Sequence, residues 1–411
     1  MPTLQPIARA LVPADSTAAD ALGAPNYDEF QSDLEVWELL RQRPASVLSI
    51  TMPHCAVDDA AAIGTDGAED ALAAAARNMA RLSADPRVRE LRDLMWVYEI
   101  TRPEAPGKPQ TGLGGMARVQ DIRTDANPAG TIVRNEGIRE AKALARARLT
   151  QATSMDMGTV NLAVDDSSGA LQSALERHAG AHPPAFETTD ETGNHHRVWL
   201  LQDAAEQRIL RGLAQAEPLA YVADGNHRSA AAAMLGYRHF LAVFFPARTM
   251  TIAPYNRLIE ADNAIADLAV RLERRFHVDA PPPGPYQPDA THDIGLYDGS
   301  AWRRLQPRAG TFDPRDAAQE IDADIVQRLL FSELFGLHDA RDPHITYVGA
   351  NRDAGWLQAQ VDAGRFRYAV TLPAVTLAQF IRVCRENKLM PPKSTWFVPK
   401  IRSGLVMAAA E

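Results

Sequence analysis

The sequence predicts an α+β protein with mixed sheets and packed helices. Short apolar runs of strand length recur along the chain and alternate with helical patterns. Residues 240–245, FLAVFF, are typical of a buried strand, whereas the alanine-rich residues 68–82 are typical of a helix. No internal repeat is visible, and a hydrophobic content of 46% with 23% charged residues is ordinary for a globular protein.

The expected elements follow from these patterns in chain order. Apolar or β-branched runs predict strands at residues 46–52, 94–101, 116–122, 160–164, 197–201, 240–245, 293–298, 301–306 and 345–350. Helical patterns lie at residues 68–82, within 132–149, up to about 276, and at 324–336 and 375–388. The Pro- and Gly-rich residues 281–288 are the clearest linker, so we predict an N-terminal and central part, 1–280, and a C-terminal α+β part, 281–411.

The stretch from Pro218 to Gly236 carries the strongest functional signal. An apolar run around Tyr221 is broken by Asp224-Gly225, and small helix-forming residues follow. This order predicts a strand, a tight turn and a helix. A β-hairpin closed by Asp-Gly is the alternative, but SAAAAML is a poor second strand.

The turn in this stretch is predicted to bind an anion. The first amides of a helix lack intrahelical acceptors, and the helix dipole is positive at that end. Asn226, His227 and Arg228 lie where those amides point outward. Arg228 adds a guanidinium that matches phosphate oxygens, and His227 adds a donor or a proton carrier.

A second basic motif lies near the C-terminus. Lys393, Ser394 and Thr395 follow two prolines that rule out a helix, and Lys400 comes seven residues after Lys393. Lysines with hydroxyls between them suit a polyphosphate or carboxylate ligand. Simple solvation of these lysines is left open as an equal alternative, despite their apolar neighbours.

Several other polar groups are interpreted as structural. Asp28 and Glu29 are expected at a helix N-terminus, where acids match the dipole. The pair His54-Cys55, beside Asp58 and Asp59, fits no known metal-site spacing and is interpreted as a polar loop.

The remaining histidine and glycine groups give no functional prediction. His195 and His196 are expected to be exposed in a polar turn. Gly112, Gly114 and Gly115 are expected to be ordinary loop glycines, because a dinucleotide-binding loop would introduce a helix and these precede a strand.

The composition opposes several function classes. A net charge of −9 and the lack of a helix-turn-helix pattern oppose nucleic-acid binding, including a role in DNA partitioning. Cys55 and Cys384 fit no zinc or redox spacing, which favours a reduced, cytoplasmic protein. No stretch approaches the length of a membrane span, so we expect a soluble protein with no membrane partner.

Five motifs, taken in order, resemble one family. They are APNYD at 24–28, NE at 135–136, VADGNHRSAAA at 222–232, PYNR at 254–257 and MPPKSTWFVPKIRSGL at 390–405. On these motifs the chain is identified as a member of the family known as domain of unknown function 1015, over essentially its full length. The Gly-Asn-His-Arg turn also resembles the phosphate-binding turn of the ParB/sulfiredoxin superfamily, which includes free L-serine kinases.

The resemblance implies a ParB/sulfiredoxin-like nucleotide-binding core with additional N- and C-terminal elements. It implies that nucleotide phosphates are cradled by Asp224, Gly225, Asn226, His227, Arg228 and Ser229, with Asp224 helping to hold Mg²⁺. Glu136 and His227 become the catalytic candidates, with Glu136 as the base. Contacts to substrate or phosphate are implied for Arg257, Lys393, Ser394, Thr395 and Lys400.

The implied function is phosphoryl transfer from ATP or ADP to the hydroxyl of a free amino acid such as L-serine. The chain departs from the family pattern in having asparagine where histidine is favoured, at Asn135, Asn226 and Asn256, and in having Asn26 in place of a proline. Asparagine forms hydrogen bonds but does not titrate. A non-catalytic nucleotide-binding regulatory protein and a nucleotide hydrolase therefore remain alternatives. The acceptor, the donor nucleotide and the oligomeric state, with a homodimer among the options, are left open.

Overall fold

The computed structural model describes residues 1–261, 265–281 and 283–410, and the chain divides into two compact units. The first unit comprises Met1–Arg134, Ile138–Met250 and Pro399–Glu411, and the second comprises Asn135–Gly137 and Thr251–Val398. The C-terminal segment thus returns to the first unit. The boundary predicted at residues 280/281 falls inside the second unit.

A mixed sheet forms the centre of the first unit. Within the described residues it has 12 strands, in the order β5-β10-β7-β11-β4-β3-β2-β20-β6, with β1 paired to β4 and β9 paired to β3 and β8. β10 runs parallel to β5 and antiparallel to β7, so the sheet is mixed, as predicted. The strands are β1 (Leu4–Gln5), β2 (Ile7–Pro13), β3 (Val88–Thr101), β4 (Gln110–Arg118), β5 (Ile132–Val133), β6 (Met155–Asp156), β7 (Val160–Val164), β8 (Phe186–Thr189), β9 (His195–Leu201), β10 (Ala220–Asp224), β11 (His239–Pro246) and β20 (Met407–Ala409).

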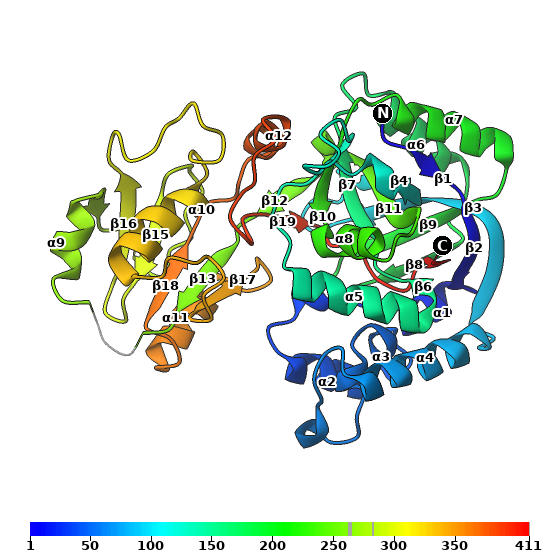
Figure 1. Ribbon diagram of the computed structural model, residues 1–411, viewed down its shortest axis with the longest axis horizontal. Helices are drawn as coiled ribbons and strands as arrows, with labels where there is room; N and C mark the ends of the chain where they lie inside the picture. Colours follow the sequence, from blue (N-terminus) through cyan, green and yellow to red (C-terminus); the bar gives the residue numbers. More distant parts are fainter. Residues whose placement is uncertain (262–264, 282, 411) are drawn as a thin grey trace. The chain divides into compact units, whose positions relative to one another are not determined.

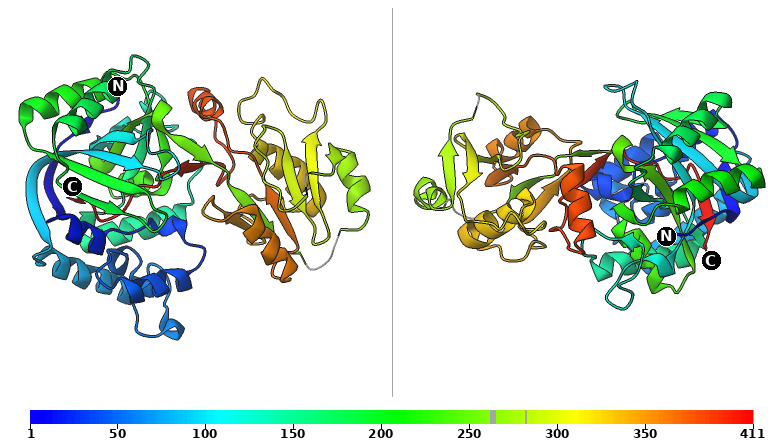
Figure 2. Two further views of the ribbon diagram at one scale, coloured as in Figure 1. Left: turned by 180° about the vertical axis from the view of Figure 1, so that it is seen from behind. Right: turned by 90° about the horizontal axis from the view of Figure 1, so that it is seen from above.

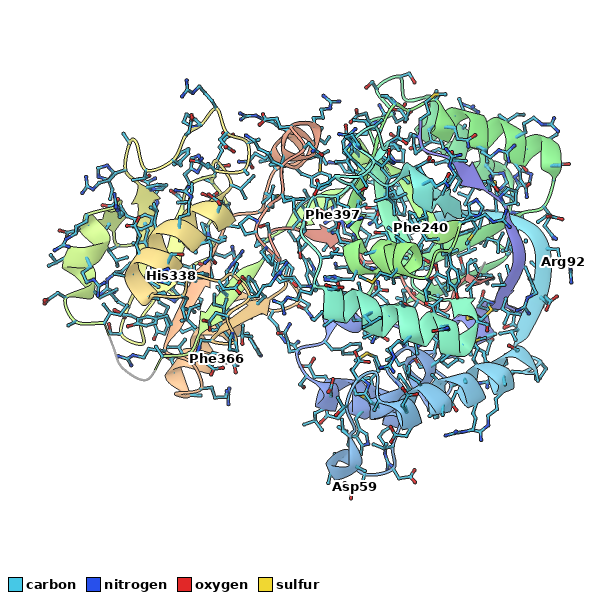
Figure 3. The ribbon with its side chains drawn as sticks, viewed as in Figure 1. Asp59, Arg92, Phe240, His338, Phe366 and Phe397 are labelled. Atoms are coloured by element: carbon cyan, nitrogen blue, oxygen red, sulfur yellow. The ribbon has the colours of Figure 1, made fainter. Side chains whose placement is uncertain are left out.

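Helices cover this sheet and build a second apolar core beside it (Figure 1). α8 packs against β7, β11 and α5, and α5 in turn contacts α4, whereas α6 and α7 contact β4. Phe240 of β11 is buried in the sheet core, and Arg92 of β3 is exposed at the outer edge (Figure 3). The helices are α1 (Ser16–Leu22), α2 (Asp33–Gln42), α3 (Leu48–Thr51), α4 (Glu69–Ser83), α5 (Glu140–Thr153), α6 (Ala170–Ala181), α7 (Ala204–Gln215) and α8 (Asn226–Met234).

The second unit is built on an antiparallel sheet. Its six described strands have the order β14-β16-β15-β18-β13-β17, and β12 and β19 form a separate antiparallel pair (Figure 2). Leu258, Trp302 and Leu357 belong to its apolar core, where α11 packs on β18. The elements are β12 (Thr251–Ala253), β13 (Asn256–Ile259), α9 (Leu268–Glu273), β14 (Phe276–Asp279), β15 (Ile294–Tyr297), β16 (Trp302–Pro307), α10 (Asp322–Ile325), the π-helix η6 (Val326–Phe335), β17 (Ile345–Val348), α11 (Ala354–Asp362), β18 (Tyr368–Thr371), α12 (Leu377–Arg385) and β19 (Trp396–Val398).

Most predicted elements are confirmed, but two strand predictions are wrong or too long. Residues 46–52 contain the helix α3, because a short apolar run fits a buried helix as well as a buried strand, and here Leu48 and Ile50 pack in the helical core. The strand expected at 116–122 ends at Arg118 and continues as a 3₁₀ turn, η4 (Val119–Asp121).

The interpretation of Gly112, Gly114 and Gly115 as loop residues is also wrong. All three lie buried within β4. Trp96 of β3 is the direct cross-strand partner of Gly114, and a Cβ on Gly114 would lie 2.0 Å from the Trp96 ring. The glycine therefore makes room for an indole between two central strands.

His196 is fully buried, which corrects the expectation that it is exposed. It continues β9 and pairs with Ile100 of β3. Its Nδ1 lies 2.7 Å from the Tyr98 hydroxyl and its Nε2 lies 3.1 Å from Asp190 Oδ2. His195 is only partly exposed.

None of the helices in the described ranges has both the length and the apolar character that crossing a bilayer requires.

Gly114→Ala is expected to destabilise the first unit by about 2–4 kcal/mol, because the new methyl group would overlap the Trp96 ring inside a packed sheet. Urea unfolding followed by tryptophan fluorescence would measure the loss. Gly180→Ala is the matched control: its Cβ would meet nothing within 4 Å near the end of α6, so a gain of about 0.5–1 kcal/mol is expected. Equal stability of Gly114→Ala and the wild type would contradict this account of β4.

Candidate functional site

The stretch from Pro218 to Gly236 folds as predicted, as strand β10, a tight turn and helix α8. Gly225 forms the turn with φ of 98°, a conformation that L side chains rarely adopt. A Cβ at this position would also lie 3.2 Å from Val160 Cα of β7. Glycine is therefore required both for the backbone conformation and for the close approach of β7 to the turn.

Arg228, in the first turn of α8, is almost completely buried and has partners on three segments. It donates to the carbonyl oxygen of Thr159, lies 3.4 Å from Asn26 Oδ1 and pairs with Asp224 Oδ1 at 3.3 Å. Burial alone would lower the pKa of Arg228, but the carboxylates of Asp224 and Asp28 raise it. The guanidinium is therefore a permanent charge that ties β10 to the N-terminal segment.

Lys400 reaches the same carboxylate from the C-terminal segment. Its Nζ lies 2.9 Å from Asp224 Oδ2, and the exposed fractions of the two side chains are only 13% and 16%. Burial would lower the pKa of Lys400, but Asp224, Asp28 and Glu29 raise it. Asp224 thus holds one cation on each oxygen.

Glu29 is a member of this cluster that the sequence interpretation missed. It ends the 3₁₀ turn η1 (Tyr27–Glu29), whereas α2 begins only at Asp33, so the acids do not cap that helix. Burial raises the pKa of Glu29 to about 8, Lys400 opposes that rise, and Asp28 and Asp224 add to it. The signal in the sequence was the APNYD motif, whose acid Asp28 follows the turn-forming Pro25-Asn26 and directly precedes Glu29.

Asn26 links η1 to the C-terminal segment. Its Nδ2 donates to the carbonyl oxygen of Ile401 at 2.7 Å, and its Oδ1 accepts from the Ser403 hydroxyl at 3.0 Å. An amide that acts as donor and acceptor at once explains why asparagine suits this position. Together with Arg228, these bonds hold η1, α8 and residues 400–403 around the end of β10.

His227 and Ser229 have local structural partners. His227 Nε2 accepts from the backbone amide of Arg139 at 2.9 Å, which fixes the neutral tautomer with its proton on Nδ1. The Arg139 residue is the N-cap of α5, so His227 joins the start of α5 to that of α8. The Ser229 hydroxyl is fully buried and donates to the Asn226 carbonyl at 3.1 Å.

A cavity of about 60 Å³ adjoins Arg228 in the first unit. Leu149, Met157 and Ala231 give it apolar walls, while Asn26 and Arg228 are among its polar lining residues.

The second unit gathers most of the other predicted residues into a cluster of its own. Glu136 Oε2 accepts from the amide of Lys393 at 3.1 Å, and Asn135 Nδ2 lies 3.4 Å from Thr395 Oγ1. Lys393 adopts a left-handed backbone with φ of 58°, and the Ser394 hydroxyl donates to the Pro391 carbonyl within the same turn. These contacts bring the NE and KST motifs together within the second unit, a proximity that the sequence alone did not predict.

Arg257 supports this cluster from β13. It is 2% exposed, donates to the Tyr255 carbonyl, and lies 3.3 Å from the carbonyl oxygen of Lys393. Burial lowers the pKa of Arg257. Asn256, next to it, uses both ends of its amide, donating to Gln287 Oε1 at 2.9 Å and accepting from the Leu372 amide at 3.0 Å.

The donor set around Asp224 fits Mg²⁺ only in part. Mg²⁺ is usually held by one or two carboxylates together with substrate phosphates. Asp224 already has a cation on each oxygen, whereas Asp28 and Glu29 supply further carboxyl oxygens beside it. Asp28 would have to hold the ion together with Asp224, whose carboxylate would divide its interactions between the ion and Lys400.

Glu29→Gln is expected to remove a pH dependence of stability. A carboxyl group with a raised pKa contributes stability that is complete below its ordinary pKa of 4.5 and is lost as the pH rises through about 8. The free energy of unfolding of the wild type should therefore fall between pH 5 and pH 8, relative to Glu29→Gln, by on the order of 1–3 kcal/mol after allowance for partial exposure. Urea unfolding at both pH values measures this difference. Glu38→Gln, on the exposed face of α2, is the control and should leave it unchanged. Parallel pH profiles of the wild type and Glu29→Gln would contradict the raised pKa.

Comparison with solved structures shows distant similarity. A free serine kinase in complex with AMP has 13% identity, covers 67% of this chain and 89% of its own, and gives a TM-score of 0.38. A conserved hypothetical protein from Pyrococcus furiosus has 12% identity, covers 67% and 92%, and gives a TM-score of 0.37. SbnI with a C-terminal truncation, from Staphylococcus aureus, has 8% identity, covers 71% and 85%, and gives a TM-score of 0.38.

A search of curated proteins gave no match. The family described as protein of unknown function (DUF1015) matches residues 4–329, which span the DGNHR turn, the Asn26–Glu29 segment, Glu136 and Arg257, while the MPPKST motif lies beyond the match. The resemblance found in the motifs is confirmed: the chain belongs to the DUF1015 family.

Proposed function

We propose that this protein is a small-molecule kinase that transfers a phosphoryl group from ATP or ADP to the hydroxyl of a free amino acid such as L-serine. The single observation that carries the proposal is the Glu29 carboxyl group, whose pKa of about 8 places it close to physiological pH beside Lys400 and Asp224. Perturbed carboxyl groups of this kind are typical of acid–base sites.

The proton acceptor is the part of the reaction that these residues support best. The acceptor hydroxyl attacks the terminal phosphorus, the bond from that phosphorus to the leaving nucleotide oxygen breaks, and the hydroxyl proton passes to the Glu29 carboxylate. At pH 7 about a tenth of Glu29 is in the carboxylate form, so the rate should rise with pH through about 8.

The turn between β10 and α8 is proposed to position the nucleotide phosphates. The N-terminal end of α8 carries no acidic residue in its first turn, and Gly225 keeps side chains away from the backbone there. Helix amides at such an end favour phosphate oxygens. Lys400 supplies a positive charge that can divide its interaction between Asp224 and a phosphate, while Arg228 keeps the turn in place.

Bound Mg²⁺ would neutralise phosphate charge at this end of β10. Asp28 and Asp224 are the residues that would hold it. The protein's own residues would bind the nucleotide, orient the acceptor hydroxyl and accept its proton. These are most of the tasks that phosphoryl transfer requires of a protein.

Product analysis tests the proposed reaction. Purified protein is incubated with Mg²⁺ and γ-labelled ATP, with and without a pool of amino acids that includes L-serine, and then with β-labelled ADP. We expect the label to appear on an amino acid, which identifies that amino acid as the acceptor. Label released only as inorganic phosphate would identify a hydrolase, and measurable nucleotide binding without any product would identify a regulatory protein; either result overturns the kinase proposal.

Two matched variants decide which glutamate acts as the base. Glu29→Gln is expected to lower turnover by at least about 100-fold, the usual contribution of a general base, and to remove the rise in rate through pH 8, with little change in nucleotide affinity. Glu136→Gln tests the candidate implied by the family resemblance in the same assay. Loss of the pH-dependent rise in Glu136→Gln, but not in Glu29→Gln, would transfer the role to Glu136. Glu38→Gln controls for the loss of one surface charge.

A further inference from the structure

Three metal-binding side chains from two distant segments meet in the helical part of the first unit. Asp33 is the first residue of α2, and His54 and Cys55 end the short 3₁₀ turn η2 (Pro53–Cys55). One ligand atom from each, a carboxylate oxygen, an imidazole nitrogen and the thiol sulfur, lie within 4.8 Å of one another. Asp33 is therefore a closer partner of the pair than Asp58 or Asp59, which follow it in sequence.

The His54 imidazole is buried without a hydrogen bond. Its side chain is 1% exposed, and neither ring nitrogen has a hydrogen-bond partner among the described residues. Nε2 lies 3.4 Å from Asp33 Oδ1, and Nδ1 lies 3.8 Å from Asp66 Oδ1. A buried polar group without a partner costs free energy, so an imidazole aimed at a thiol and a carboxylate points to a missing ligand between them.

We propose that Asp33, His54 and Cys55 bind a divalent transition-metal ion of the zinc class. Zinc accepts this combination of sulfur, nitrogen and oxygen ligands, whereas Mg²⁺ and Ca²⁺ require oxygen alone. Ligand atoms around a tetrahedral zinc ion are about 3.4–3.6 Å apart, given its usual bond lengths. A contraction from the present spacing of up to 4.8 Å requires only side-chain movement of roughly 1 Å, and Asp33 is free to make it because its side chain is 53% exposed.

Asp66 supplies the carboxylate that orients a metal-bound histidine. A metal-bound imidazole commonly donates its other N–H to a carboxylate, which orients the ring. Asp66 faces His54 Nδ1, and Arg146 of α5 fixes Asp66 with two contacts of 2.8 Å. Arg146 also donates to the Thr51 carbonyl at 2.9 Å, at the end of α3. Asp66 is thus a positioning residue for the proposed site.

Because Asp33 is exposed, water would occupy the fourth coordination position of the proposed metal ion. The Cys55 and His54 side chains are buried below it, and η2 is packed against α2, α3 and α4. The ion would therefore link the start of α2 to η2 and stabilise the helical part of the unit. The metal-free alternative is a direct contact of the His54 ring with the Asp33 and Asp66 carboxylates, and cobalt titration separates it from the proposal.

Cobalt titration tests the site with a spectroscopic readout that is independent of turnover. The full-length protein is freed of metal with a chelator under reducing conditions and titrated with Co²⁺. A thiolate-to-cobalt charge-transfer band that saturates at one ion per chain is expected, because the Cys55 sulfur would bind the ion directly. Zn²⁺ should displace Co²⁺ and raise the melting temperature of the metal-free protein.

Matched variants assign the band to this cluster. Cys55→Ser should abolish the charge-transfer band, whereas Cys384→Ser, which removes the chain's other cysteine, should keep it. Asp33→Asn, at a half-exposed position, should weaken Co²⁺ binding at least tenfold, and Asp66→Asn should weaken it by about 10- to 100-fold. Asp59→Asn, at the exposed tip of the neighbouring loop (Figure 3), should have no effect.

The outcomes that overturn the proposal are equally specific. The absence of a band in the wild type would leave the direct contacts of His54 with Asp33 and Asp66 as the explanation, and so would an unchanged Co²⁺ affinity in Asp33→Asn. A band that survives in Cys55→Ser, or is lost in Cys384→Ser, would place the metal elsewhere. Circular dichroism of each metal-free variant shows whether it is folded. If Cys55→Ser does not fold, the Co²⁺ affinity of Asp33→Asn decides whether the metal binds at this cluster.

Discussion

The first unit depends on one buried carboxylate at the end of β10. Asp224 accepts Arg228 on one oxygen and Lys400 on the other, and all three side chains are largely buried. Removing one partner of a buried ion pair is strongly destabilising, because the remaining charge is left without compensation. Arg228 extends the network to Asn26, so this single carboxylate positions the N-terminal segment, the first turn of α8 and the C-terminal segment together.

The same network explains the unusual proton affinity of Glu29. A buried carboxyl group next to a lysine usually has its pKa lowered, since the cation stabilises the carboxylate. Here Lys400 is already neutralised by Asp224, and Asp28 adds another negative charge, so burial dominates. Binding of a phosphate at Lys400 would change this balance, which couples ligand charge to the protonation of Glu29.

Local sequence signals predicted the structure of the central motif, whereas the features that depend on contacts between distant residues were not predicted. β10, the Gly225 turn and α8 follow from residues that are neighbours in the chain, and their prediction is confirmed. Glu29 lies beside Lys400, more than 350 positions away in the sequence, and no local pattern predicts that proximity. His196 was misread for the same reason, because its turn-like neighbours conceal a pairing with β3.

Length and context limited the other predictions. The apolar residues 46–52 are too few to distinguish a strand from a helix, and packing against the helical core decides in favour of α3. The glycines of β4 resemble a loop until the cross-strand partner Trp96 is known. Asp33 lies 21 positions before His54, so the spacing of neighbouring residues indicated the wrong acids.

The segment from Asn26 to Asp33 connects both proposed sites, with Glu29 near one end and Asp33 at the other. Arg146 contacts this segment through the Tyr27 ring, 4.6 Å from its guanidinium carbon, and holds Asp66 with the same guanidinium. An ion at Asp33 would therefore restrain the segment that carries Glu29 without adding any charge next to that carboxyl group, so its effect on catalysis would act through the position of η1 and not through the pKa of Glu29.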